Sequence, residues 1–145
     1  MKRGSHRGFT LLELTIVTAI VATLAAIALP SYAAYVKRSR ILDAVTRLAD
    51  LRARMDDYFL DQRAYVDDAG LCGAGAAASA TDSFIVECEA TATSFTVTAR
   101  GLAAKGMTGF VYTIDQTGAK ATLSVPSGWS RTPDCWTIRQ DGFCV

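Results

Sequence analysis

A stretch of 23 residues without a charged side chain, from Leu14 to Val36, constrains this chain more than any other feature. At a rise of about 1.5 Å per residue, a helix of that length spans about 35 Å, more than the ~30 Å hydrocarbon core of a bilayer. Three basic residues precede it, as in a secretory signal, but the stretch is too long for an ordinary signal core. The sequence therefore predicts a helix that crosses a membrane once.

A carboxylate interrupts the start of this apolar segment. Glu13 directly precedes the uncharged run. A carboxylate in a bilayer costs about 2.5–3.5 kcal/mol on insertion scales, and such residues usually have a partner. A simple membrane anchor has no use for this side chain, so Glu13 predicts a cationic partner that offsets its cost.

The residues around Glu13 form a motif. The segment from Gly8 to Leu14, GFTLLEL, resembles the processing motif of type IV prepilins, and Pro30-Ser31-Tyr32 fits the continuation of that family. The resemblance implies that a prepilin peptidase and N-methyltransferase cuts between Gly8 and Phe9 and methylates the new amine of Phe9. It also implies that Glu13 pairs with the Phe9 amine of a neighbouring subunit, so that two costly groups neutralise one another. The alternatives are an uncleaved signal-anchor with an incidental Glu13 and a cleaved secretory peptide.

The pattern becomes amphipathic after Lys37. Apolar residues recur at three- and four-residue steps, which places them on one helical face. They are Ile41, Val45, Leu48, Leu51, Met55, Tyr58 and Phe59. We expect one long helix over roughly residues 9–62. Pro30 removes one backbone hydrogen bond and should kink or loosen that helix, and the resemblance implies that this region can unwind in a filament.

Strand patterns follow a Gly- and Ala-rich loop over residues 66–83, which we expect to lie on the surface. Four strands are expected over residues 84–88, 94–99, 110–114 and 120–124, with a turn at 115–118. This predicts an α+β fold with a long helix against an antiparallel sheet, and the resemblance implies the type IV pilin fold. The expected parts are a leader at residues 1–8, an apolar helix at 9–36 and a globular region at 37–145. Asp67-Asp68 is expected to be a solvated acidic turn, because two adjacent acids are a weak signal for calcium.

Four cysteines behind a membrane segment predict two disulfides in an oxidising compartment. Three pairings are possible, and we favour the local pairs Cys72–Cys88 and Cys135–Cys144; four reduced thiols are the alternative. The second pair would close a loop at the C-terminal end. Trp129 and Trp136 beside it are expected either to anchor a partner or to cover the sheet as core.

The residues exclude several functions. The only histidine is His6, in the expected leader, and there is no phosphate loop or dinucleotide fingerprint, so neither an enzyme, a cofactor nor a metal site is expected. From Asp61 onward six basic residues face nine acids, which disfavours a general nucleic-acid binder. The only candidate DNA contacts are Lys105, Lys120, Arg131 and Arg139.

The resemblance thus implies a structural subunit of a surface filament used in adhesion or twitching motility, with other pilin subunits as partners. The precursor is expected in the bacterial inner membrane with its C-terminal region outside the cytoplasm, and the mature chain in the extracellular pilus. The two cysteine pairs and the Cys135-Trp136 ending resemble minor pilins of the PilE kind. A major pilin, a DNA-uptake pilin and a pseudopilin of type II secretion remain alternatives.

Overall fold

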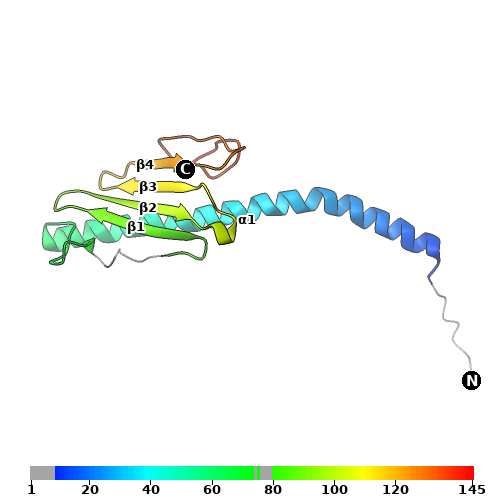
Figure 1. Cartoon of the computed structure of the whole chain (residues 1–145), viewed down its shortest axis with the longest axis horizontal. Coiled ribbons are helices and arrows are strands. Elements are labelled where there is room, and N and C mark those ends of the chain that lie inside the picture. The colour runs from blue at the N-terminus through cyan, green and yellow to red at the C-terminus, as the bar shows by residue number, and fades with distance from the viewer. Residues whose placement is uncertain (1–8, 74, 76–79) are drawn as a thin grey trace, which may run out of the picture. The chain divides into compact units, whose positions relative to one another are not determined.

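The computed structural model describes residues 9–73, 75 and 80–145 of the chain. In these residues a long helix, α1 (Leu11–Gln62), is followed by β1 (Phe84–Ala90), β2 (Phe95–Gly101), the short 3-10 helix η2 (Ala103–Lys105), β3 (Val111–Asp115) and β4 (Lys120–Ser124) (Figure 1). The chain divides into two compact units, one that ends at Val36 and one from Lys37 to Val145. We refer to Lys37–Val145 as the head.

The unit that ends at Val36 contains the apolar part of α1. Its large apolar side chains are exposed on all sides of the helix, from Leu11 at 81% to Tyr35 at 70%. The hydroxyls of Thr15, Thr18 and Thr23 donate to backbone carbonyls three or four residues earlier, so these polar groups are satisfied within the helix. Within the described residues, α1 is the one helix long and apolar enough to cross a membrane.

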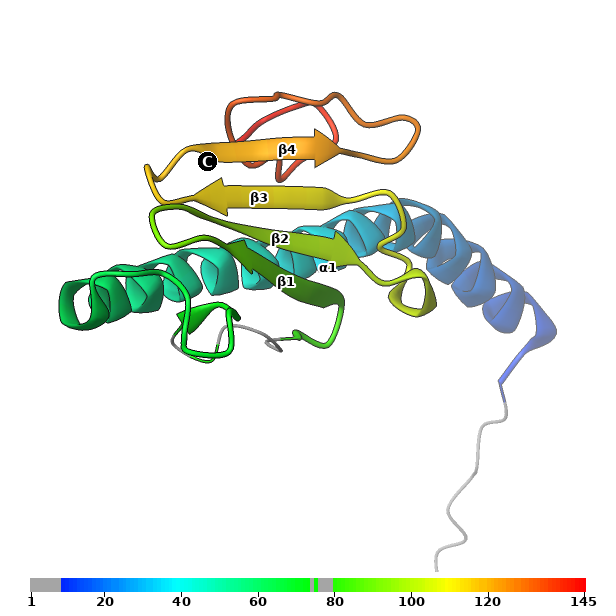
Figure 2. The ribbon, with the colours of Figure 1, turned by 60° about the vertical axis from the view of Figure 1, so that its left-hand side comes forward.

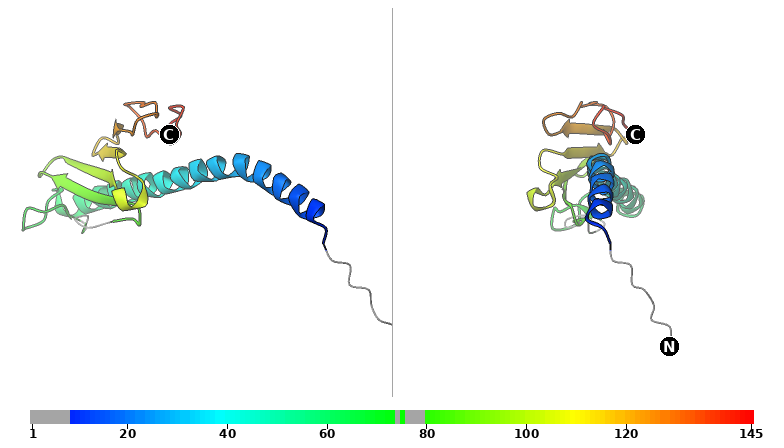
Figure 3. Two further views of the ribbon diagram at one scale, coloured as in Figure 1. Left: turned by 45° about the vertical axis from the view of Figure 1, so that its right-hand side comes forward. Right: turned by 90° about the vertical axis from the view of Figure 1, so that its right-hand side faces the viewer.

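The head part of α1 supplies one side of the hydrophobic core. Its fully buried residues recur at three- and four-residue steps, so they form a stripe along a single face. They are Ile41, Ala44, Val45, Leu48, Leu51 and Met55. All four strands lie on one side of this part of α1 (Figures 2 and 3), and their inward side chains, such as Phe84, Val97 and Tyr112, complete the same core.

The sheet is antiparallel throughout, with the strand order β1-β2-β3-β4. Its register pairs Val86 with Ala99 and Ala99 with Tyr112, so these buried side chains line one face. The β3–β4 turn is fixed by Asp115, whose carboxylate accepts the Thr117 hydroxyl and the N–H groups of Thr117 and Ala119. These hydrogen bonds, the Thr117 hydroxyl first, hold the pKa of Asp115 below its usual range.

The structure confirms the predicted α+β plan, in which a long helix packs on a four-stranded antiparallel sheet and a disulfide bounds the C-terminal loop. The predicted helix and strand bounds differ from the observed ones by at most two residues. Pro30 lies inside α1, and the helix runs on through it. The kink expected there stays a prediction.

The prediction of an exposed loop over residues 66–83 was wrong in part. Cys72 and Gly73 are buried. A short bridge pairs Val66 with Cys72, and a Cβ added to Gly73 would lie 2.2 Å from the ring of Tyr58. The disulfide between Cys72 and Cys88 holds this segment against β1.

Candidate functional site

The first candidate site is the start of α1. Gly8 lies outside the described residues, whereas Phe9 is described and is 79% exposed. Helix α1 begins at Leu11, and Glu13 lies in its first turn. No cationic group within the described residues forms an ion pair with the Glu13 carboxylate.

Thr10 is a helix cap that the sequence patterns above did not identify. Its hydroxyl oxygen accepts the backbone N–H of Glu13 at 3.2 Å, which satisfies one of the free donors at the helix start. The pattern Thr-x-x-Glu before an apolar run is the sequence signal that identifies such a cap. Glu13 also carries negative charge near the positive end of the helix dipole, which is favourable. Any role of Glu13 in assembly must therefore be separated from its role in starting the helix.

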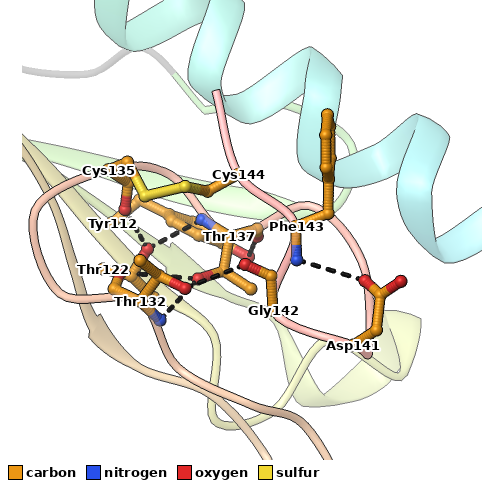
Figure 4. The surroundings of a disulfide bond; sticks show 9 residues. All are labelled: Tyr112, Thr122, Thr132, Cys135, Thr137, Asp141, Gly142, Phe143 and Cys144. Atoms are coloured by element: carbon orange, nitrogen blue, oxygen red, sulfur yellow. Dashed lines mark hydrogen bonds between the residues drawn. A yellow bond between two sulfur atoms is a disulfide. The ribbon is translucent and has the colours of Figure 1, made fainter.

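The second candidate site is the C-terminal loop, residues 125–145, which lies beyond β4 (Figure 3). Three threonine hydroxyls join this loop to the sheet and to itself (Figure 4). Thr122 of β4 donates to the carbonyl of Cys135 and accepts the N–H of Thr137 at 2.9 Å. The hydroxyl of Thr137 accepts the N–H of Thr132, whose own hydroxyl donates to the carbonyl of Gly142. Because Thr122 and Thr137 are fully buried, the bond between them replaces water that the Thr137 N–H has lost.

Two large aromatic residues reinforce this attachment. The buried Tyr112 hydroxyl donates to the carbonyl of Thr137 at 2.8 Å, and burial raises the pKa of Tyr112 well above its usual value. The indole N–H of Trp136 donates to the carbonyl of Thr113 at 2.9 Å. Trp136 is therefore part of the core, and Trp129 is partly buried with its ring edge-on to Phe110.

Two disulfides complete the head. Cys72 is joined to Cys88, and Cys135 to Cys144, so the bonds link the same local pairs that the sequence favours. Asp67 lies near the first bond, and its carboxylate accepts the N–H groups of Ala69 and Leu71, which accounts for this acid as part of a turn.

The four basic residues considered for DNA binding are not brought together. Lys105 follows β2 and pairs with Asp82, whereas Lys120 begins β4 at the opposite end of the antiparallel sheet, where it lies over the ring of Trp136. Arg131 donates to the carbonyls of Thr122 and Leu123 on the edge strand. Arg139 pairs with Asp141 at 2.8 Å and lies over Phe143. Each of these cations is thus already engaged within the head.

Comparison with known proteins identifies the family of this chain. The prokaryotic N-terminal methylation motif matches residues 3–29, and the family described as "Type IV minor pilin ComP, DNA uptake sequence receptor" matches residues 30–122. The chain is also 32% identical to the fimbrial protein EcpC of Eikenella corrodens over 127 residues, which are 86% of this chain and 83% of EcpC. The chain belongs to the type IV pilin family.

Other relatives of this pilin are major subunits. It is 33% identical to the type IV major pilin protein PilE of Neisseria gonorrhoeae over 82 residues, which are 57% of this chain and 49% of PilE. It is 41% identical to the type IV major pilin protein PilA of Myxococcus xanthus over 68 residues, which are 47% of this chain and 31% of PilA. This pilin thus covers about half or less of these two major pilins. Neither family match extends over residues 123–145, which include the whole C-terminal loop.

Proposed function

We propose that this pilin is a minor subunit of a type IV pilus. In this proposal a prepilin peptidase removes residues 1–8 by cutting between Gly8 and Phe9, and residues 9–36 then enter the filament core. The head, residues 37–145, is displayed on a surface filament that serves adhesion or twitching motility. The observation that carries the proposal is an apolar helix surface that stays exposed on all sides within its own chain.

An uncovered surface of this kind needs another apolar environment. Soluble proteins rarely leave large contiguous apolar patches in water. Leu12, Ile16 and Ile20 are each more than half exposed, and their threonine neighbours have turned their hydroxyls onto the helix backbone. The segment therefore suits lipid in the precursor and packed helices of neighbouring subunits in the filament.

Glu13 is proposed to pair with the Phe9 amine of the next subunit. That amine exists only after cleavage, and the Glu13 carboxylate forms no ion pair within the described residues. An unpaired charge costs several kcal/mol in an apolar setting, so the pair favours one register between adjacent helices.

Substitution can separate this pairing from helix capping. Glu13→Gln keeps the Thr-x-x-Glu/Gln pattern of a capping box but removes the charge, and Glu13→Val removes both the pattern and the charge. We expect both variants to insert into the membrane and to fail in assembly, measured as sheared filament against membrane-bound subunit. Thr15→Val is the matched control in the same exposed segment and should assemble normally. Normal filament yield from Glu13→Gln would assign the residue to capping and contradict the pairing.

The role of a minor subunit is favoured by the match to the ComP family, whose description is that of a minor pilin. Quantitative mass spectrometry of purified filaments tests it directly. A minor subunit should be present at a small fraction of another pilin, and filaments made mostly of this chain would establish a major pilin. Filament counts after gene deletion distinguish two roles. Filaments that persist indicate an accessory subunit, and their loss indicates a subunit required to start assembly.

DNA binding during uptake is a second candidate function, because the matched family is described as a DNA uptake sequence receptor. The four candidate cations are separated and engaged, so the head offers weak support for a site driven by charge alone. A gel shift of the head across salt concentrations tests this function, since each lost phosphate contact reduces the salt slope by about one. If the C-terminal loop binds DNA, Arg139→Gln within that loop should weaken binding, and Lys105→Gln, which lies outside the loop, should not.

A further inference from the structure

We propose that the end of the head where α1 enters it rests on an anionic phospholipid surface before the subunit joins a filament. This inference depends on the proposed function in one respect, namely that the apolar segment lies in a bilayer. The surface, termed the basic foot below, consists of Lys37, Arg38 and the residues of η2, Ala103–Lys105.

The first step is the position of the charges. Lys37 and Arg38 are the first charged residues after the 23-residue uncharged run, and both are exposed. Within the described residues neither forms an ion pair. The next acid along α1 is Asp43, about 9 Å further from the apolar run at a helical rise of 1.5 Å per residue. Basic residues in this place lie at the level of lipid headgroups.

The second step is a contact that brings a distant segment to the same level. Arg40 turns toward the sheet, and its guanidinium donates to the carbonyl of Lys105 at 2.6 Å. That bond holds η2 beside the entry point of α1 in the head, where the turn that follows β2 lies near the helix in Figure 2. Residues 65 positions apart in the sequence thus share one end of the head.

The third step is the chemistry of the exposed surface. Ala103 and Ala104 are small and exposed, so they allow a close approach to a flat surface, and Gly106 ends the turn at a positive φ of 68°. Lys105 is paired with the exposed Asp82, so the cations of the basic foot that form no ion pair within the described residues are Lys37 and Arg38. Near the opposite end of α1, Asp56, Asp57 and Asp61 are balanced by Arg52, Arg54 and Arg63, so the excess of basic residues lies at the end next to the apolar run. This polarity selects an anionic surface over a neutral one.

The test uses the full chain in lipid nanodiscs, made either of phosphatidylcholine alone or of phosphatidylcholine with phosphatidylglycerol. The readout is hydrogen exchange of peptides that cover residues 100–110. We expect several-fold slower exchange in the anionic discs, and loss of this difference in about 0.5 M salt, where screening shortens the range of surface charge to a few ångströms. Each basic residue near an anionic membrane surface strengthens the attachment about fivefold. Removing Lys37 and Arg38 together should therefore weaken the attachment of the head to the anionic disc about 25-fold.

A matched pair of double variants separates position from net charge. Lys37→Gln with Arg38→Gln should abolish the lipid-dependent protection. Arg54→Gln with Arg63→Gln removes the same charge near the far end of α1 and should retain it. Equal exchange in both lipids, or equal loss in both variants, would overturn the inference.

Two further outcomes are distinguishable. If the chain fails to copurify with either disc, the proposed membrane anchoring fails, whereas copurification without lipid-dependent protection overturns only the basic foot. Protection that follows the number of subunits in each disc, and not the lipid, would assign Lys37 and Arg38 to a neighbouring copy and contradict a lipid contact.

Discussion

Replacing Thr122 by valine should destabilise the head more than replacing it by serine. Valine has nearly the shape of threonine and suits a strand, so hydrophobic reasoning alone predicts the opposite order. The side chain of Thr122 is fully buried, and its hydroxyl is bonded to the carbonyl of Cys135 and the N–H of Thr137. Thr122→Val would leave the buried N–H of Thr137 and the partly buried carbonyl of Cys135 without that partner.

The magnitudes follow from these contacts. A buried group left unsatisfied costs about 1–3 kcal/mol and a partly buried one costs less, so Thr122→Val should lower the free energy of unfolding by about 2–4 kcal/mol. Thr122→Ser keeps the hydroxyl and loses one methyl, which costs about 1 kcal/mol. Thr96 is exposed on β2, and Thr96→Val should change the free energy of unfolding by less than about 0.5 kcal/mol.

Urea unfolding of the head, residues 37–145, measures these differences as shifts of the midpoint at constant slope. Circular dichroism and thiol titration first establish that each variant is folded and oxidised. A Thr122→Val head at least as stable as the Thr122→Ser head would refute the role assigned to the hydroxyl.

Two other substitutions test the core. The raised pKa of Tyr112 means that the stability tied to its protonated form is complete below pH 10, the pKa in the unfolded chain, and is lost as pH rises above it. Unfolding free energy should fall by about 0.8 kcal/mol from this residue between pH 8 and 10.5, and Tyr112→Phe should remove that component; identical pH profiles would contradict the assignment. Gly101→Ala should destabilise the head by about 1–3 kcal/mol in the same urea assay, because the added Cβ would lie 1.9 Å from the carbonyl oxygen of Met107. A neutral effect there would show that the close approach is not required.

Much of the fold could be predicted from local patterns. The stripe from Ile41 to Met55 and the alternation of Phe95, Val97 and Ala99 are periodic signals that one element carries by itself. The local cysteine pairs were also favoured from their spacing. The cap at Thr10 could have been found in the same way, since the pattern Thr-x-x-Glu is contained in four residues.

Other features depend on residues that come together only in the folded head. The bond from Arg40 to Lys105 joins a helix to a turn 65 residues later, and neither segment alone predicts it. The burial of Gly73 depends on the ring of Tyr58. Thr122 and Thr137 are ordinary strand and loop residues in the sequence, and their role follows from the path of the C-terminal loop.

Mass spectrometry of the N-terminus of this pilin in purified filaments tests the central claim most directly. We predict a chain that begins with an N-methylated phenylalanine at position 9, since only that cleavage creates the amine that Glu13 requires. Assembled filaments in which residues 1–7 remain attached would contradict the proposed processing and the assembly that depends on it.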